Sequence, residues 1–432
     1  MYNLKGKRLL VLAGVNPIAV DVVRTAKRLG AYTIVTGNLD VSLCPAKRYA
    51  DESSDVSTAD LDALENLIHE KNIDGVLTGS SEFGIERVIS LCERLNLPFY
   101  CNREQWEICS DKEKFKNLCR KNNVPVVPEY IVQDENGKLD FTGIEYPVIV
   151  KPVDGSGGGG ISVCDTEPEL KIAYERAKNY SKCGNVIIEK YIVQDEVGIN
   201  YAIQNGNIML TAMHDRYLHA GTAGFMRLPL AYVYPSKHLK SYQKNQNEKV
   251  IDMFKSIGLQ NGTLFIQGFA GEEKCMFYEM GYRFNGAKQY NLLKDANGFS
   301  TMEMIVNLSL TGEMGGPDIR ECANPNFDHV YCTLSILGYP GKIKEVIGIQ
   351  EIEKIPEVLD VSPWYFGGEE ITEALLGTQR QILCRVTLKT NDRKEMAAAI
   401  DKVYDKFDVI SEQGSSMLME GFDSKLLLEE EE

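Results

Sequence analysis

The first hundred residues alternate between short apolar runs of strand length and longer segments in which apolar residues recur with the helical period. The apolar runs lie at residues 8–12, 32–36 and 76–78. Strands separated by crossover helices pair in parallel, and the helices then cover both faces of the sheet. The pattern therefore predicts an α/β fold with a parallel sheet. Predicted helices cover residues 17–30, 61–69 and 83–95, and a fourth strand is predicted at 98–100.

The loop after the first predicted strand contains a single glycine, Gly14. Dinucleotide-binding loops at this position need the G-x-G-x-x-G pattern, whose glycines let the backbone approach a pyrophosphate. That pattern is absent, so the sequence predicts no nicotinamide or flavin site here.

Size and charge narrow the possible functions. A chain of 432 residues is expected to form two or three domains. Hydrophobic residues make up 44% and charged residues 25%, as in ordinary globular proteins, which excludes collagen-like and wholly disordered chains. The net charge of −15 argues against a nucleic-acid partner, because cationic contacts to phosphates supply most of that affinity.

The cysteines and the apolar runs predict a cytoplasmic location. Eleven cysteines are scattered singly with no C-x-x-C pair, which favours free thiols in a reducing compartment over disulfides or a zinc site. The apolar run at residues 9–15 is too short to span a membrane and lacks a cleavage site for a signal peptide. We therefore expect no membrane association.

The remainder of the chain shows weaker patterns. Ser110 and Glu113 predict a capping box that begins a helix. Residues 147–312 are mostly strand-like, and after Gly338 short strands precede one more helix. The acidic tail at 429–432 is expected to be a solvated charge run. The predicted helices in these regions cover residues 170–180, 248–257, 300–310 and 393–404.

A glycine-rich loop lies between two apolar runs at residues 147–163. Glycine lets backbone N–H groups approach phosphate oxygens, and Lys151, at the end of the first run, adds a positive charge. We predict a hairpin whose tip covers a polyphosphate; the alternative is a flexible linker. A Walker A loop is excluded because Ile161 follows the glycines. The predicted phosphate-binding residues of the loop are Ser156, Gly157, Gly158, Gly159 and Gly160.

A second segment is an apolar strand at residues 186–192 that contains Glu189 and is followed by Asp195 and Glu196. The peptide edge of such a strand would hydrogen-bond an adenine ring, and Glu196 would accept hydrogen bonds from ribose hydroxyls. The alternative is an ordinary edge strand with exposed charges.

A third segment, residues 264–285, reads as an antiparallel hairpin with its turn at 270–274. With that turn Gln267 opposes Phe277, and Glu279 is the diagonal neighbour of Gln267 on the same face. Two oxygen ligands on one face suit Mg²⁺ bound together with phosphates. Arg283 lies on that face if the strand continues, where it would hold a phosphoryl group or a carboxylate. The alternative is a surface hairpin with scattered polar groups.

The order of these segments resembles the ATP-grasp superfamily, most closely its branch of biotin carboxylase, carbamoyl phosphate synthetase and L-amino acid ligase. The resemblance covers nearly the whole chain. It implies an α/β (α+β) architecture in three parts: a Rossmann-like domain at 1–108, an ATP-grasp domain at 109–312 made of two α+β subdomains, and a C-terminal α+β domain at 313–432. The glycine loop would belong to a lid subdomain at about 124–192.

The resemblance also implies roles for individual residues. Lys112, in Ser110-Asp111-Lys112, matches the first ATP lysine of the family, and Lys151 matches the second. Glu196 matches the ribose-binding acid. The adenine-binding hinge would be Glu189, Lys190, Tyr191 and Ile192.

Gln267 and Glu279 fall on the metal positions of the family, and Arg283 on its catalytic arginine. The family usually has Glu-x-Asn-x-Arg, whereas this chain has Gly281 at the asparagine position, so a third metal ligand is missing there. Asn285 would replace it, or one of two Mg²⁺ ions would be held less tightly.

The implied activity is that of a ligase using ATP and Mg²⁺. A small carboxylate becomes an acyl phosphate, and an amine then displaces phosphate, so no side-chain nucleophile is required. Candidate substrate residues are His214, Arg216 and Arg227. The expected partners are a small carboxylate and an amine, with a second copy of the chain suggested by the dimers of the family.

Two alternatives stay open. One is an enzyme that forms carboxyphosphate or carbamoyl phosphate. The other is a non-catalytic ATP-binding module, which the glycine at position 281 motivates.

Overall fold

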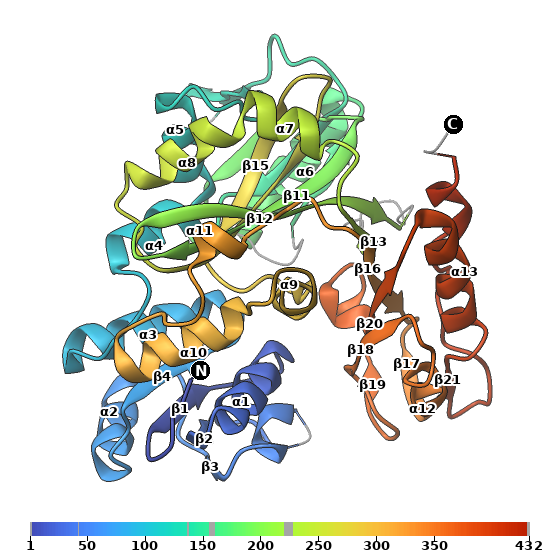
Figure 1. The fold of residues 1–432 in the computed structure, drawn as a ribbon. Coiled ribbons are helices and arrows are strands. Elements are labelled where there is room, and N and C mark those ends of the chain that lie inside the picture. Colours follow the sequence, from blue (N-terminus) through green and yellow to red (C-terminus); the bar gives the residue numbers. More distant parts are fainter. Residues whose placement is uncertain (1, 42, 136–137, 155–159, 220–227, 430–432) are drawn as a thin grey trace.

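The computed structural model describes the chain apart from residues 1, 42, 136–137, 155–159, 220–227 and 430–432. Its N-terminal part is a parallel sheet in the order β3-β2-β1-β4, seen at the bottom of Figure 1. The strands are β1 (Arg8–Leu12), β2 (Tyr32–Thr36), β3 (Glu52–Ser54) and β4 (Gly75–Thr78); the helices are α1 (Ile18–Arg28), α2 (Leu61–Glu70) and α3 (Glu82–Leu95).

Both faces of this sheet are buried, as the continuous apolar runs predict. Leu9 and Val11 pack into one apolar cluster with α1, while Leu10 and Leu12 pack into another with α2 and α3. Alternate side chains of a strand point to opposite faces, so both sets need to be apolar. The predicted parallel sheet and its three helices are confirmed.

The predicted fourth strand at 98–100 is wrong, because these residues form no strand. The fourth strand is β3, whose sequence Glu-Ser-Ser has no apolar run. It lies at the edge of the sheet and is half-buried or exposed, so its pairing is held by backbone hydrogen bonds rather than by burial.

Two helices, α4 (Arg103–Ser110) and α5 (Lys112–Lys121), connect this domain to the next. The predicted capping box of Ser110 and Glu113 is wrong, because Ser110 is the last residue of α4. Asp111 caps α5 instead, and its carboxylate accepts a hydrogen bond of 2.8 Å from the backbone N–H of Lys114. Lys112 therefore begins α5, and Lys116 lies one turn later on the same face.

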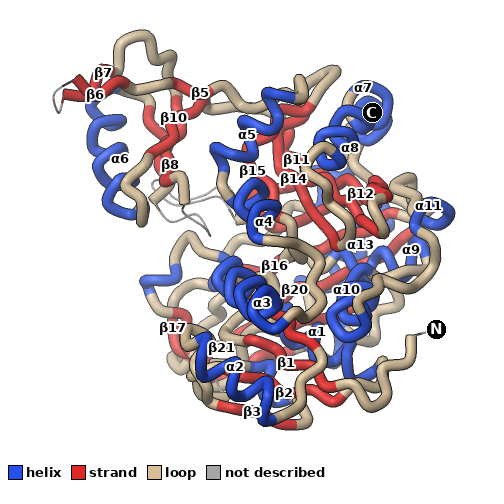
Figure 2. Tube along the Cα trace, turned by 90° about the vertical axis from the view of Figure 1, so that its left-hand side faces the viewer, coloured by secondary structure: helices blue, strands red, loops and turns tan. Residues whose placement is uncertain are grey.

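A small antiparallel sheet in the order β5-β10-β8-β9 carries the glycine-rich segment. Figure 2 shows that this unit projects from the rest of the molecule, with α5 beside its base. Its strands are β5 (Glu129–Tyr130), β8 (Val148–Pro152), β9 (Ser162–Cys164) and β10 (Val186–Lys190), and it includes α6 (Glu167–Tyr180) and the β6 (Gln133–Glu135) and β7 (Lys138–Asp140) hairpin. Strands β8 and β9 pair antiparallel, as predicted for the segments that flank the glycines.

The largest sheet has eight strands in the order β15-β14-β11-β12-β13-β16-β20-β18. It is continuous from the predicted metal-binding hairpin to the C-terminal part of the chain (Figure 1). Its strands are β11 (Asp195–Gln204), β12 (Asn207–Leu218), β13 (Pro229–Tyr234), β14 (Gly262–Ala270), β15 (Cys275–Gly281), β16 (Val330–Leu337), β18 (Val358–Pro363) and β20 (Ile382–Thr390).

Helices cover this sheet and join it to the N-terminal domain. Val250 and Phe254 of α8 pack into the same apolar cluster as Leu264 and Ile266 of β14. That cluster also contains Leu9 and Val11 of β1, so one core joins the two parts. The helices are α7 (Leu239–Asn245), α8 (Asn247–Lys255), α9 (Gln289–Asn297), α10 (Thr301–Thr311) and α11 (Ile319–Cys322).

The C-terminal part has its own apolar cluster, in which Met396 and Ile400 of α13 (Arg393–Tyr404) pack with Val386 of β20. The predicted helix at 393–404 is confirmed. Among the residues that the structure describes, no helix has the length and apolarity needed to cross a membrane. The remaining elements are β17 (Gly341–Ile347), β19 (Glu370–Ile371), β21 (Asp408–Ser411), α12 (Ile349–Ile352) and the 3₁₀ turns η1 (Pro45–Arg48), η2 (Glu373–Leu375), η3 (Gln379–Gln381) and η4 (Ser424–Leu427).

Candidate functional site

The β14–β15 hairpin brings Gln267 and Glu279 directly opposite each other. The predicted pairing of Gln267 with Phe277 is wrong, because Phe277 pairs with Gly268. A β-bulge after Gln267 inserts Tyr278 as an extra residue and shifts the register by one. Because residues directly opposite on paired strands share a face, Gln267 and Glu279 become neighbours.

Glu279 faces the first residue of α5. Its Oε2 lies 3.9 Å from Nζ of Lys112, and its side chain is 35% exposed. Within the described part of the chain, no group of three or more His, Cys, Asp or Glu side chains is placed to hold a metal. Glu279 is therefore the one carboxylate that strands β14 and β15 offer to a cation.

Gly281 stands where the family pattern has asparagine, and the structure explains why no side chain fits. A Cβ at this position would lie 2.6 Å from the ring of Phe265. Asn285, the suggested replacement, is buried, and its Oδ1 accepts a 2.6 Å hydrogen bond from the backbone N–H of Ala287. The oxygen of Asn285 thus serves a local turn.

Arg283 lies two residues beyond the end of β15. Its Nη2 donates a 3.0 Å hydrogen bond to Oε1 of Glu82, the first residue of α3, and its guanidinium lies 5.1 Å from the centre of the Phe265 ring. Sequence reasoning missed Glu82, because a carboxylate at the start of a helix usually has only a local electrostatic role.

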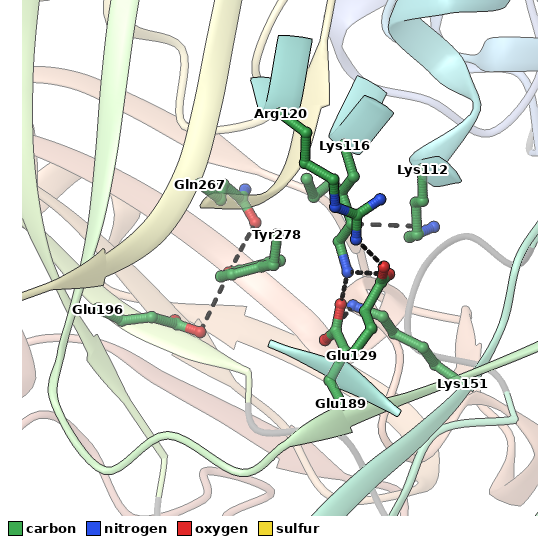
Figure 3. Close-up of polar contacts among 10 residues, drawn as sticks. Lys112, Lys116, Arg120, Glu129, Lys151, Glu189, Glu196, Gln267 and Tyr278 are labelled. Atoms are coloured by element: carbon green, nitrogen blue, oxygen red, sulfur yellow. Dashed lines mark hydrogen bonds and ion pairs between the residues drawn. The ribbon is translucent and has the colours of Figure 1, made fainter. Parts of the chain in front are cut away.

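Arg216 joins the predicted ribose-binding and metal-binding residues in one network. Figure 3 shows Tyr278 between two of these residues, Glu196 and Gln267. Its Nη1 lies 2.9 Å from Oε2 of Glu196, 2.6 Å from the Tyr278 hydroxyl and 3.2 Å from Oε1 of Gln267. Burial opposes the charge of Arg216, but Glu196 and Tyr278 outweigh it and raise its pKa. The sequence had grouped Arg216 with the substrate residues; the structure brings it to Glu196 and Gln267.

A cluster of charges lies between α5 and the small sheet, with Lys116, Lys151 and Glu189 buried at its centre (Figure 3). Nζ of Lys151 is 2.6 Å from Oε2 of Glu189, and Lys116 contacts Oε1 of the same carboxylate. Lys116 is also 2.6 Å from Oε1 of Glu129, which in turn contacts Arg120. We call these five residues the lysine cluster. Sequence reasoning missed Lys116, Glu129 and Arg120; the signal was a lysine one turn after Lys112, at a position where the helix needs a buried residue.

The electrostatics of the lysine cluster favour an anion. Burial lowers the pKa of Lys151 well below its ordinary value, and the charges of Lys116 and Lys112 lower it further. Burial also lowers the pKa of Lys116, although Glu129 opposes this. Positive charges that depress one another's pKa values are stabilised when a polyanion binds among them.

The hinge and the glycine loop are described in part. The backbone N–H groups of Lys190 and Tyr191 donate to the carbonyl oxygens of Pro128 and Pro147 at 3.0 and 3.1 Å. Gly160 has a φ of +77°, which favours glycine. Four predicted loop residues, Ser156, Gly157, Gly158 and Gly159, and the predicted substrate residue Arg227 lie outside the described residues.

His214 is inside the large sheet. It is 1% exposed, its ring packs against those of Tyr232 and Tyr234, and its Nδ1 lies 3.3 Å from Nδ2 of Asn200. Burial lowers its pKa well below the ordinary value, so the ring is neutral. A Cβ on Gly198 would lie 2.2 Å from its Nε2, so this glycine makes room for the ring.

Arg385 of β20 is a buried cation that the sequence did not reveal. Its side chain bonds the carbonyl oxygen of Gly286 and lies 3.3 Å from the hydroxyl of Ser335, with Trp364 4.9 Å away. Its Nη2 has no hydrogen-bond partner within the described part of the chain. A buried guanidinium with a free donor is suited to bind an anion. In the sequence Arg385 is one charged residue in an apolar strand, which is also the pattern of an ordinary edge strand, so its role could not be predicted.

A second buried cation, Lys288, lies in the chain segment that follows Arg283. It is close to Arg385, because it bonds Ser362, the strand partner of Arg385. It is 4% exposed, and its Nζ lies 2.9 Å from Oδ2 of Asp21 in α1 and 2.6 Å from the hydroxyl of Ser362 in β18. This segment therefore connects the N-terminal domain to the C-terminal strands.

Comparison with known proteins identifies the part of the chain that holds these residues. The family profile described as "Carbamoyl-phosphate synthase L chain, ATP binding domain" matches residues 111–283. The matched segment begins with the cap of α5 and ends at Arg283.

Curated relatives match over part of their length. The 2-oxoglutarate carboxylase small subunit of Hydrogenobacter thermophilus is 32% identical over 205 residues, which are 43% of this chain and 42% of the relative. The carbamoyl phosphate synthase large chain of Clostridium botulinum strain Langeland is 24% identical over 60% of this chain and 25% of its own length. The chain thus spans less than half the length of these two relatives.

Solved structures match nearly end to end. The L-amino acid ligase of Bacillus licheniformis superposes with a TM-score of 0.76 at 17% identity, covering 94% of this chain and 99% of that one. Phosphoribosylglycinamide synthetase from Anaerococcus prevotii gives a TM-score of 0.72 at 20% identity, covering 94% and 100%. At these identities the likeness establishes the fold.

The profile and the fold agree with the motifs read from the sequence. The α/β architecture is confirmed by the parallel sheet, the antiparallel sheets and these neighbours. Residues 111–283 therefore match an ATP-binding domain of the carbamoyl-phosphate synthase type, and the chain as a whole has the fold of these solved structures.

Proposed function

We propose that this chain is an ATP-dependent ligase that activates a small carboxylate as an acyl phosphate and joins it to an amine, releasing ADP and phosphate. One observation carries the proposal: cations from α5 and β8 converge with the carboxylate of the β15 strand. Lys112, Lys116 and Glu279 all act electrostatically on Lys151, although all three are distant from Lys151 in the sequence. A nucleoside triphosphate needs cations beside its phosphates and a carboxylate that binds its metal ion.

The donor set is suitable for Mg²⁺. The carboxylate of Glu279 is partly exposed, and its ion pair with Lys112 is long, at 3.9 Å. Oε1 of Gln267 already lies within hydrogen-bonding distance of Arg216 and Tyr278, so Glu279 would be the principal ligand and Gln267 a shared one. When bound there, Mg²⁺ neutralises charge on the phosphate oxygens.

The side chains of this site position reactants rather than attack them. Lys112 and Lys151 bind phosphate oxygens, and Arg283, oriented by Glu82, stabilises the negative charge that spreads during phosphoryl transfer. The thiols are poor nucleophiles; burial raises the pKa of Cys92, Cys119 and Cys275 to about 12. Activation as an acyl phosphate fits these properties, because the substrate carboxylate is itself the nucleophile.

The buried guanidinium of Arg385 supports an anionic substrate. Burial lowers its pKa, and the ordinary compensation for such a charge is a carboxylate or phosphate. The carbonyl of Gly286, which Arg385 bonds, lies three residues after Arg283, so an anion held by Arg385 would be close to the segment that carries the catalytic arginine. We propose that Arg385 binds the substrate carboxylate or a phosphate attached to it.

A second candidate is a carboxyphosphate-forming enzyme that uses bicarbonate. The observation that favours it is the 32% identity with a 2-oxoglutarate carboxylase small subunit. Both candidates use the same nucleotide site and differ in the acid that attacks ATP.

The test measures ADP and phosphate release with ATP and Mg²⁺. Pools of small carboxylates and amines are added together and separately, and bicarbonate is added alone. Release that requires both a carboxylate and an amine supports the ligase, and mass spectrometry then identifies the amide. Release with bicarbonate alone supports the second candidate, and ADP binding without any turnover contradicts both.

A further inference from the structure

The lysine cluster contains one carboxylate that is shared between two lysines. Oε1 of Glu189 pairs with Lys116, and Oε2 of Glu189 lies 2.6 Å from Nζ of Lys151 (Figure 3). All three side chains are buried, with exposures of 0% for Lys116, 6% for Lys151 and 3% for Glu189. The pairing therefore takes place out of water, where an uncompensated charge is costly.

The strands bring two carboxylates together at this point. Glu129 of β5 and Glu189 of β10 are directly opposite each other in the antiparallel pair. Like charges in this position repel. Lys116 lies between them and contacts both, so helix α5 supplies the cation that makes this pairing stable.

The cluster contains three cations (Lys116, Arg120, Lys151) and two carboxylates (Glu129, Glu189), so its formal charge is 3 − 2 = +1. One cation can therefore leave without exposing an unpaired carboxylate. Arg120 stays with Glu129 and Lys116 stays with both carboxylates, so Lys151 is the cation that can be released.

We propose that Lys116 is a positioning residue that keeps Glu189 neutralised, so that Lys151 is free to bind the phosphates of a nucleotide. This inference rests on the proposed nucleotide site. Lys116 does not touch the ligand itself; it removes the need for Lys151 to remain with Glu189.

The proposal makes a specific statement about charge balance. In Lys116→Met, Arg120 remains with Glu129 and Lys151 remains with Glu189, so every carboxylate still has one cation. The protein keeps its paired charges, but Lys151 is now the only counter-ion of Glu189. Binding of a phosphate by Lys151 would then leave a buried carboxylate unpaired, and affinity must fall.

The experiment measures the dissociation constant of Mg²⁺-ADP by calorimetry in four forms of the full chain: wild type, Lys116→Met, Lys116→Met/Glu189→Gln and Lys114→Met. Lys114 is the matched control, since it lies on the same helix but pairs with Glu107 at the surface, with 51% of its side chain exposed. We expect Lys116→Met to weaken ADP about tenfold or more, as removal of one partner of a buried charge pair does in binding sites. The Lys114→Met variant should bind as the wild type does.

Rescue separates positioning from simple structural damage. Because Glu189 also belongs to the predicted adenine hinge, rescue is measured with tripolyphosphate, which has no adenine. Glu189→Gln removes the negative charge that holds Lys151, so the double variant should recover most of the tripolyphosphate affinity that Lys116→Met loses. Weak binding by the double variant, or unchanged binding by Lys116→Met, overturns the proposal. If Lys116→Met does not fold, the affinity of the single variant Glu189→Gln for tripolyphosphate is compared with that of wild type. An affinity at least equal to that of wild type supports the release of Lys151, and a clear loss of affinity overturns the proposal. A wild-type chain that binds neither ADP nor tripolyphosphate contradicts the nucleotide site itself.

Discussion

The lysine cluster and Arg385 both place positive charge inside the protein, but within the described residues only the cations of the cluster form ion pairs with carboxylates. Glu189 and Glu129 compensate Lys151 and Lys116 in the cluster. Arg385 bonds a carbonyl and a hydroxyl, and within the described residues it has no ion pair and one unpaired donor, Nη2. The first region can exist with or without a ligand because each of its charges is paired with an opposite charge, whereas the second gains most from an incoming anion.

This difference suggests that the two regions bind different substrates. The lysine cluster, whose charges are paired with one another, would bind the nucleotide. The region around Arg385, with its unpaired donor, would select the acid to be activated. Changes in one should then affect the nucleotide alone, and changes in the other the acid alone. A change at Glu279, the proposed metal ligand, should affect both substrates, because the phosphoryl group is transferred from one to the other.

The largest expected effect is therefore at Glu279. Glu279→Ala removes the carboxylate that we propose as the principal metal ligand, and turnover should fall by roughly 100-fold or more, because metal stabilisation of the phosphoryl group contributes several kcal/mol. Steady-state ADP release measures this. The control is Glu273→Ala, an exposed carboxylate in the turn of the same hairpin, which should leave turnover unchanged. Turnover of the Glu279 variant within about threefold of wild type would refute the assignment.

Arg385→Met tests the region with the unpaired cation. The KM of the carboxylate should rise by roughly 30-fold, as for a charged hydrogen bond worth about 2 kcal/mol, while the dissociation constant of ADP stays constant. The variant removes the unpaired donor Nη2 but also the hydrogen bonds to Gly286 and Ser335, so urea unfolding is measured alongside to show that the variant is folded. A loss of ADP affinity in this variant would show that the two regions are not separate.

Lys151→Ala is the reciprocal test. The KM of ATP should rise about tenfold, because one cation leaves the phosphates, and the KM of the carboxylate should be unaffected. Initial rates at varied concentrations of each substrate distinguish the two constants. An unchanged KM for ATP would argue against the contact that we assign to Lys151.

Gly281→Ala examines the metal hairpin without changing any charge. The added Cβ would lie 2.6 Å from the Phe265 ring, so the ring or the strand must move. Overpacking of this kind costs about 1–3 kcal/mol, which should appear as a lower midpoint of urea unfolding. Gly14→Ala is the matched control, because a Cβ at Gly14 would lie 3.9 Å from the nearest atom, in ordinary van der Waals contact. Equal stability of Gly281→Ala and wild type would contradict the close packing of Phe265.

The smallest effect concerns acid stability. Burial opposes the charge of Glu129, but Lys116 and Arg120 outweigh it and lower its pKa below the ordinary 4.5. A carboxylate whose folded pKa is depressed contributes stability that is present above 4.5 and is lost as the pH falls through its folded pKa. The stability difference between wild type and Glu129→Gln should therefore shrink as the pH falls below 4.5. A difference that stays constant would mean that Glu129 is not stabilised by these cations.

Much of the fold was predictable because it depends on local periodicity. The strands at 8–12 and 32–36 and the helix at 393–404 appear where the apolar pattern indicates. The edge strand β3 was missed, because an edge strand with polar residues has no apolar run to recognise. The start of α5 was misplaced by one residue because Ser110 and Asp111 are both good caps, and only the end of α4 decides between them.

The candidate site divides in the same way. Lys112, Lys151, Glu189, Glu279 and Arg283 could be named from motifs, since phosphate and metal chemistry restricts the residue types and their order. Lys116, Arg385 and Glu82 could not, because each acts through a partner that is distant in the sequence. The bulge at Tyr278, which pairs Gln267 with Glu279, also leaves no local sign.

The amino-acid sequence by itself determined the strands and helices of the N-terminal sheet, the hairpin that flanks the glycines, and the set of cations and carboxylates suited to a nucleotide, because burial periodicity and residue chemistry are local properties. Tertiary structure alone decided which of those charges compensate one another. Pairing energy depends on distance and on exclusion from water, and both are set only when α5, β5, β8 and β10 pack together. That packing is what leaves Glu189 shared between Lys116 and Lys151, and Arg385 without an ion pair among the described residues.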